Sequence, residues 1–395
     1  MRADAVAWER AAEVREAAEG WRRAGAIDTS TYDAIINAYP DPCVTPSAVW
    51  RVLTAGMVTA IVLCTLGALG VATKPGATAL SLLLLVLGVA AFVVTERLQA
   101  SPRSARRGAA GATAFWGGVF VLAGLALFLS EDRRIPWERT LQIVLFASAL
   151  VWAASGWRWG SPFFAGLSAV SLFLFLGRLP LGRVLWVLIG VALVGLVARI
   201  PDEPGWAPSH RRSAMVLLVA GVAAVYGSLN VYSLDAYLIE GFLKYTPSHP
   251  ALPSWQLVLG AIATAALPPV ILLWAWTSRR VVLLDTGVVL LALSLVTLRH
   301  YVHLAPLWVV LTVSGALLIG LALAVERALR HSPGGERSGF TADALFSDER
   351  RQRIFQTVPL VATFTPATAP AAATEEKGFA GRGGTFGGGG ASDRF

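Results

Sequence analysis

About ten apolar runs follow one another between Val52 and Val325, each separated from the next by a short polar break. Most of them approach the roughly 20 residues that cross the hydrocarbon core of a bilayer as an α-helix. Because hydrocarbon offers no hydrogen-bond partner to a peptide N–H or C=O group, a chain this apolar has to satisfy its backbone within helices. The sequence therefore predicts an all-α, polytopic helical membrane protein with about ten transmembrane helices, in contact with a lipid bilayer.

The polar breaks set the limits of the expected spans. These are Val52–Thr73, Ala77–Thr95, Ala112–Leu129, Leu141–Ala154, Pro162–Leu176, Leu181–Ala198, Ala214–Tyr232, Trp255–Trp276, Val281–Leu298 and Pro306–Val325. The fourth and fifth are the shortest, so the length criterion leaves the number of spans between about nine and eleven.

The distribution of charge predicts the orientation. Only 15% of the residues are charged, against roughly a quarter in soluble domains, and the net charge is +8. With the N-terminus in the cytoplasm, the loops and chain ends on that side hold thirteen basic residues, and the outer loops hold eight. Basic residues concentrate on the cytoplasmic side, so we expect both termini there. A basic membrane protein meets anionic lipid, and we expect no nucleic acid partner.

Composition divides the chain into three predicted domains: a cytosolic helical hairpin at 1–48, a transmembrane bundle at 49–330, and a disordered cytosolic tail at 331–395. In the hairpin, Ala3–Arg23 has the composition of a helix, and Gly25 follows where a left-handed cap is expected. Asp28, Thr29 or Ser30 then caps a second helix. No apolar signal-peptide core precedes the first span, so that span is expected to serve as an uncleaved insertion signal.

The tail ends in a glycine-dominated segment, Gly378–Phe395, with the sequence GFAGRGGTFGGGGASDRF. Such a segment buries too little surface to offset its ordering entropy, so we expect it to be disordered. Its three phenylalanines, spaced by glycine, suggest a recognition tag for a protein partner. The N-terminal hairpin is the other candidate for such docking.

The hairpin carries a resemblance. The residues Trp21-Arg-Arg-Ala-Gly25-Ala-Ile27, followed by a capped Tyr-Asp-Ala-Ile-Ile helix and a run of spans, have the form W-x-x-x-G-x-[IL]. This resembles a bacterial family of predicted multi-pass membrane proteins of unknown function. The glycine-rich tail is similar to those of some TPM-domain envelope proteins. Both resemblances imply a protein of the bacterial inner membrane, and neither supplies a catalytic residue.

Polar residues gather around the end of the seventh span. Tyr226, Asn230, Ser233, Tyr237 and Glu240 recur at spacings that place them on one helical face. On the predicted topology, His300 and His303 follow the ninth span on the same side of the membrane. These residues suggest a solute-binding rim or the ordinary polar chemistry of a membrane interface. Two histidines three residues apart could also supply metal ligands or an acid–base pair, but no recognised metal motif is present.

Two further features lie inside expected spans. Asp285 is little more than one turn into the ninth span, where a charge is costly, so it is either paired with Arg279 or Arg280 or couples transport to an ion. Pro268 and Pro269 interrupt the eighth span. Each removes a donor and crowds the carbonyl four residues earlier, so a kink is expected, and the Thr264 hydroxyl is a candidate to satisfy a freed carbonyl.

Two functions are compatible with this pattern. The first is a non-enzymatic scaffold, sensor or accessory protein of the bacterial envelope. The alternative is a small-solute transporter with its site near the kinked span and Asp285. No catalytic residue, metal site or cofactor motif is recognisable, and an enzyme is the less favoured class.

Overall fold

The computed structural model describes residues 3–23, 25–40, 48–73, 76–100, 108–131, 135–200, 205–235, 254–278 and 280–301, together with scattered residues from 312 to 341. Twelve helices and one pair of two-residue strands lie in this part of the chain. The chain divides into two compact units, of which the first contains residues 2–124 and the second residues 125–342.

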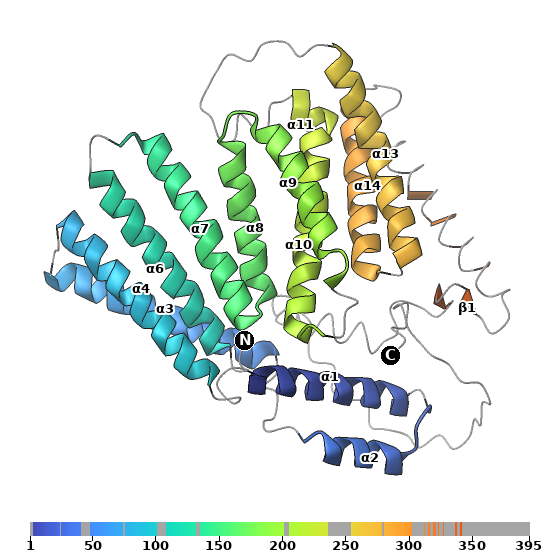
Figure 1. The fold of residues 1–395 in the computed structure, drawn as a ribbon, viewed down its shortest axis with the longest axis horizontal. Coiled ribbons are helices and arrows are strands. Elements are labelled where there is room, and N and C mark those ends of the chain that lie inside the picture. The colour runs from blue at the N-terminus through green and yellow to red at the C-terminus, as the bar shows by residue number, and fades with distance from the viewer. Residues whose placement is uncertain are drawn as a thin grey trace. The chain divides into compact units, whose positions relative to one another are not determined.

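The first unit begins with the predicted hairpin of α1 (Ala3–Arg23) and α2 (Thr29–Ala38) (Figure 1). Gly25 has φ +70°, the left-handed conformation expected after the first helix. Asp28 is the residue that caps α2, and its carboxylate accepts a hydrogen bond from the Thr31 N–H at 2.9 Å. The Arg22 guanidinium lies 4.0 Å from the centre of the Tyr32 ring, which ties the two helices together.

Three long apolar helices follow: α3 (Ala48–Thr73), α4 (Ala77–Gln99) and α6 (Ala109–Glu131), the last of which runs into the second unit. A Cβ atom added at Gly88 of α4 would lie 2.9 Å from the Gly117 carbonyl oxygen of α6, and one added at Gly117 would lie 3.2 Å from the Gly88 carbonyl oxygen. At Gly67 and Gly70 of α3, in contrast, an added Cβ atom would meet no atom within 4 Å, so these two glycines make no close approach to another described helix.

The second unit contains α7 (Trp137–Trp159), α8 (Pro162–Gly177), α9 (Gly182–Val197), α10 (Pro208–Leu229), α11 (Val231–Asp235), α13 (Ser254–Ser278) and α14 (Val281–Tyr301). Strands β1 (Glu336–Arg337) and β2 (Phe340–Thr341) pair antiparallel. Helix α7 packs on α8, α9 and α8 pack on α10, and α13 packs on α14 (Figure 1). Buried side chains of α10, α13 and α14, among them Leu218, Ile271 and Leu283, form its main core.

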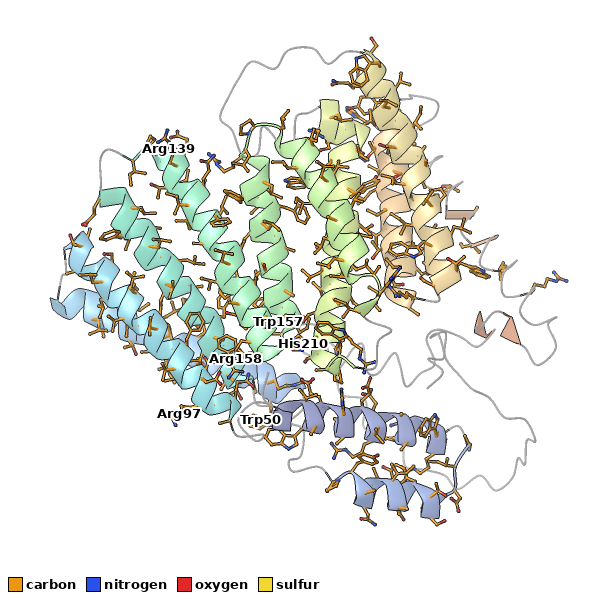
Figure 2. The ribbon with its side chains drawn as sticks, viewed as in Figure 1. Trp50, Arg97, Arg139, Trp157, Arg158 and His210 are labelled. Atoms are coloured by element: carbon orange, nitrogen blue, oxygen red, sulfur yellow. The ribbon has the colours of Figure 1, made fainter. Side chains whose placement is uncertain are left out.

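The helices are apolar on the outside and carry buried hydroxyls. Met57 and Leu273 are each 66% exposed, whereas Ser81 and Thr264 are completely buried. In water this arrangement would be unfavourable, because proteins in water usually expose their polar side chains and bury the large apolar ones. In α7 the two arginines lie near opposite ends of the helix, Arg139 in the first turn and Arg158 in the last (Figure 2). The protein is therefore a multi-pass membrane protein.

Nine of the ten expected spans coincide with helices of the described chain. Seven helices are long and apolar enough to cross a membrane: α3, α4, α6, α7, α10, α13 and α14. The fourth expected span is not short, because α7 has 23 residues. The short apolar helices are α8 and α9, with 16 residues each, or roughly 24 Å at 1.5 Å per residue.

The tenth expected span and the tail fall mostly outside the described residues. The described residues in the span, such as Thr312, Gly315 and Ile319, are helical. The exact count of ten therefore stays a prediction. The glycine-rich segment Gly378–Phe395 lies wholly outside the described residues.

Candidate functional site

Buried polar side chains of the second unit converge where α10 ends. We call this group the polar cluster; its members come from α9, α10, α11, α13, α14 and the junction between α10 and α11. They are Arg183, Tyr226, Ser228, Asn230, Ser233, Thr264, Ser294 and Thr297. Polar groups inside a membrane are costly unless they are hydrogen-bonded, so such a gathering marks either a structural junction or a functional site.

Asn230 breaks the seventh span. Its ψ of 130° is extended, so α10 ends at Leu229 and the short α11 begins at Val231. The Asn230 Oδ1 atom accepts hydrogen bonds from the backbone N–H groups of Tyr232 and Ser233, at 3.0 and 3.2 Å. The side chain thus acts as the N-cap of α11. The continuous helical stripe expected from Tyr226 to Glu240 is therefore wrong, because the capping amide redirects the chain.

From Asn230 a chain of hydrogen bonds crosses to α13. Its Nδ2 atom donates to the Tyr226 Oη at 2.9 Å, and Tyr226 in turn lies 2.9 Å from the Ser294 Oγ. The Ser294 hydroxyl donates to the Thr264 carbonyl oxygen at 2.7 Å. Since a serine hydroxyl has one hydrogen, Tyr226 must be the donor to Ser294. The chain therefore has one direction, from α10 through α14 into α13.

The last acceptor of this chain is the carbonyl that proline leaves without a helical donor. Pro268 is buried inside α13, and the carbonyl four residues before it belongs to Thr264. The Thr264 hydroxyl does not satisfy its own carbonyl. It donates to the Gly260 carbonyl at 2.7 Å and accepts from the Val231 N–H at 2.8 Å. The expected role of Thr264 thus belongs to Ser294 of the neighbouring helix.

Arg183, the second residue of α9, closes the other side of the polar cluster. Its two terminal nitrogens donate to the backbone carbonyls of Ser228 and Ser233, at 2.7 and 2.8 Å. The last carbonyls of a helix lack partners within it and carry partial negative charge, so a guanidinium suits them. Sequence reasoning missed this role because Arg183 counted only as a loop charge. A cation at the start of an apolar run, beside a run ending in Ser and Asn, was the available signal.

The structure separates the residues that the sequence grouped. His300 lies edge-on to the Tyr232 ring at 5.3 Å, next to the polar cluster. Asp285 is exposed and lies twelve residues before Thr297 on α14, or roughly 18 Å along the helix. It is therefore not part of the polar cluster. Among the residues that the structure describes, no ion pair joins it to Arg280. Tyr237, Glu240, His303 and Arg279 lie outside the described residues.

A cavity of about 220 Å³ lies among α7, α8, α9 and α10. Trp157 and His210, at the end of α7 and the start of α10, line it (Figure 2). His210 is twenty residues before Asn230, so roughly 30 Å of helix separates the cavity from the polar cluster. Within the described part of the chain, no group of three or more His, Cys, Asp or Glu residues is placed to hold a metal ion.

No family model, curated protein or solved structure matches this chain. The choice of a function therefore depends on the polar cluster, the cavity and the N-terminal hairpin.

Proposed function

We propose that this chain is a non-enzymatic scaffold or accessory protein, in which a closed membrane bundle anchors a helical hairpin that binds a protein partner. The observation that carries this proposal is the hydrogen bond made to a carbonyl that proline frees in α13. The carbonyl freed by Pro268 is occupied by the Ser294 hydroxyl at 2.7 Å, within the bundle. In a transporter, the freed backbone groups of a broken helix are the expected binding groups for a substrate or ion. Here a neighbouring helix takes that place.

The hairpin supplies the surface for a partner. Trp21 is 37% exposed and Tyr39 is 43% exposed, although both are large aromatic side chains at the end of a helix. Exposed aromatic residues of this size are the common anchors of protein interfaces. The tail segment Gly378–Phe395, with its three phenylalanines, is the second candidate for contact with the same or another partner.

We infer the location from charge and resemblance. The excess of basic residues on one side of the predicted spans supports a topology with both termini in the cytoplasm. The W-x-x-x-G-x-[IL] form of the hairpin supports the inner membrane of a bacterium. Reporter fusions after Lys74, Arg107 and Arg337 should read outside, inside and inside. An outside signal at Arg337, with the N-terminus inside, would contradict an even number of spans.

Photo-crosslinking tests the docking role of the hairpin. A photoreactive amino acid replaces Trp21 in the full-length protein, and the same amino acid at exposed Trp137, on a different helix, serves as the matched control. We expect one discrete protein adduct from position 21 and none of that mass from position 137. Deletion of Arg382–Phe395 shows whether the tail contributes to the adduct. An absence of any discrete adduct at position 21 would contradict docking through the hairpin.

A transporter is the alternative because the interrupted helix α10–α11 and the proline-containing helix α13 meet at the polar cluster. Asn230, where α10 ends, is joined through Tyr226 and Ser294 to the Thr264 carbonyl, four residues before Pro268. Paired discontinuous helices are the usual site of substrate binding in transporters. If the cluster were such a site, Ser294→Ala would abolish a cellular uptake phenotype while the hairpin adduct stayed intact. The scaffold proposal expects a loss of stability alone.

A further inference from the structure

The cavity between α7, α8, α9 and α10 has an apolar wall. Ala153, Val197, Ala214 and Leu217 contribute only hydrocarbon to it. The lining also includes two serines, but the hydroxyls of Ser168 and Ser213 donate to the carbonyls of Ala149 and Ser209, at 2.9 and 3.0 Å. Neither hydroxyl hydrogen is therefore available to an occupant. A cavity of this kind accepts hydrocarbon in preference to a polar solute.

The cavity is large enough for part of a chain and reaches the surface. Its volume of about 220 Å³ exceeds the roughly 150 Å³ in which an apolar cavity takes up a benzene-sized molecule. At one end of the lining, Val197 and Ala214 are 3% exposed, and at the other Trp157 is 65% exposed. An acyl chain can therefore enter from the surface and end against the buried side.

The exposed end of the cavity has the character of a headgroup region. Trp157 and Trp206 meet edge to face at 5.9 Å, and His210 packs against Trp157 at 5.4 Å. The His210 Nε2 atom lies 3.0 Å from the Trp157 carbonyl oxygen, which fixes the start of α10 to the end of α7. Indole rings favour the level of the lipid headgroups. This end of the four helices is thus suited to the membrane interface.

Arginines lie at this end of the helices, next in sequence to residues of the lining. Arg199 directly precedes the lining residue Ile200, Arg212 directly precedes Ser213, and both arginine side chains are exposed. Arg158 and Arg211 adjoin Trp157 and His210 in the same way. Between Arg199 and Arg212 the sequence also holds Asp202 and Glu203, which lie outside the described residues, and the segment from 157 to 213 stays basic overall. Guanidinium groups bind phosphate strongly.

We propose that this cavity binds one anionic phospholipid, with an acyl chain between α7 and α10 and the phosphate at the level of Arg199 and Arg212, at the ends of α9 and α10. On the predicted topology this end faces the cytoplasmic leaflet, which carries the anionic lipids. The lipid site does not depend on the scaffold function proposed above, and its failure would leave the hairpin adduct unaffected.

Native mass spectrometry of the full-length protein tests the headgroup contact. The protein is released from nanodiscs of equimolar phosphatidylglycerol and phosphatidylcholine, and the retained lipids are counted. We expect the wild type to retain one phosphatidylglycerol in preference to phosphatidylcholine. In Arg199→Gln/Arg212→Gln this preference should fall by about fivefold for each arginine, because a basic residue near the surface contributes about 1 kcal/mol to anionic lipid binding. Arg97→Gln/Arg139→Gln, which removes two exposed arginines elsewhere, should behave as the wild type.

A filled cavity tests the acyl-chain contact. Ala153→Phe places a ring in the cavity, whereas Ala154→Phe, at the next exposed position of α7, lies outside its lining. We expect the first variant to lose the retained lipid whatever its headgroup and the second to keep it. If Ala153→Phe lowers the Tm, its loss of lipid could reflect misfolding, and the Arg199→Gln/Arg212→Gln variant, which changes only exposed side chains, then decides the test.

Any of the following results would overturn the proposal. The first is equal retention of the two lipids by the wild type. The second is an unchanged preference in the Arg199→Gln/Arg212→Gln variant, or equal lipid retention by the two phenylalanine variants. The third is that lipid is retained only when Arg382–Phe395 has been deleted, which would show that the tail of the same chain occupies the cavity.

Discussion

The α4–α6 contact of the first unit and the α10–α13–α14 contact of the second are held together in different ways. Helices α4 and α6 meet through glycines, and the Gly88 and Gly117 backbones approach closely because neither residue has a side chain. Helices α10, α13 and α14 meet through the hydrogen bonds that run from Asn230 to Thr264. Lipid tails are as apolar as leucine, so burial of apolar surface does not drive helices together in a membrane. Close packing of glycines replaces it at the first contact, as it also does at Gly190 and Gly221 between α9 and α10, and hydrogen bonds replace it at the second contact.

A substitution in the glycine contact between α4 and α6 should lower the stability more than one in the hydrogen-bonded contact of α10, α13 and α14. Gly88→Leu brings the new Cβ to 2.6 Å from the Val121 Cγ2 atom and 2.9 Å from the Gly117 carbonyl oxygen, which is backbone and cannot rotate away. We expect a loss of about 3 kcal/mol in the free energy of unfolding, at the upper end for overpacked cores. Thermal unfolding in detergent measures it. Gly67→Leu in α3, where a Cβ meets no atom within 4 Å, is the control and should change the Tm little.

Asn230 is the strongest single position in the polar cluster. Asn230→Leu removes the cap of α11 and the donor to Tyr226 together, so we expect a loss of about 2 kcal/mol, the sum of a cap and a buried hydrogen bond. Asn230→Ser keeps a capping oxygen, loses the amide donor and introduces no charge, so it should cost less than the leucine variant. Equal losses in the two variants would show that the cap contributes nothing to stability.

The Ser294 hydroxyl should contribute less than Asn230 to the free energy of unfolding. Ser294→Ala leaves the Thr264 carbonyl without its donor, and hydrogen bonds between membrane helices contribute about 1 kcal/mol. Thr286→Ala on the same helix is the control, because the Thr286 hydroxyl donates only to the Val282 carbonyl within α14. We expect the serine variant to unfold at a lower temperature than the threonine variant. If the two unfold together, the α13 break is held by packing, as the α4–α6 contact is.

The smallest effect lies outside the membrane, at the cap of α2. Hydrogen bonds from Ser30 and Thr31 hold the pKa of the Asp28 carboxyl at about 2, below its ordinary value of 3.8. Because the folded state binds the proton more weakly, the cap stabilises α2 fully above about pH 4 and the contribution is lost as the pH falls through 2. The protection factors of amides 29–38 against hydrogen exchange in the intact protein, corrected for the intrinsic pH dependence of the exchange rate, should therefore fall across that window. In Asp28→Ala, exchange should be faster at neutral pH and lose this pH-dependent step.

The hairpin and most helix limits could be predicted from the sequence because they depend on local chemistry. Residues Ala3–Arg23 form α1 as expected, Gly25 takes the left-handed conformation, and Asp28 is one of the three capping residues proposed. The apolar runs form helices because a backbone in hydrocarbon has no alternative. The largest differences are in α7, which spans Trp137–Trp159 and not Leu141–Ala154, and in α10, which begins at Pro208 and not at Ala214, because residues of the membrane interface extend these helices beyond their apolar parts.

The candidate site was predicted only in part. Asn230 and Pro268 were singled out by residue type; Asn230 belongs to the polar cluster, and Pro268 frees the Thr264 carbonyl that the cluster satisfies. Asp285 drew attention by its charge alone, and the structure places it elsewhere. Ser294 was not singled out, because an isolated serine in an apolar run has no distinctive pattern, and Arg183 was not, because its charge was counted with those of the loop before α9.

The sequence by itself determined that the chain is helical, that it lies in a membrane, and where its water-exposed hairpin is capped, because solvation and local hydrogen bonding decide these. Only the tertiary structure decided which helices meet through glycine and which through hydrogen bonds. It also decided that the carbonyl freed by Pro268 is satisfied from α14, and that four helix ends enclose an apolar cavity beside arginines. Each of these depends on atoms far apart in the chain, and the residues carry no local record of their partners.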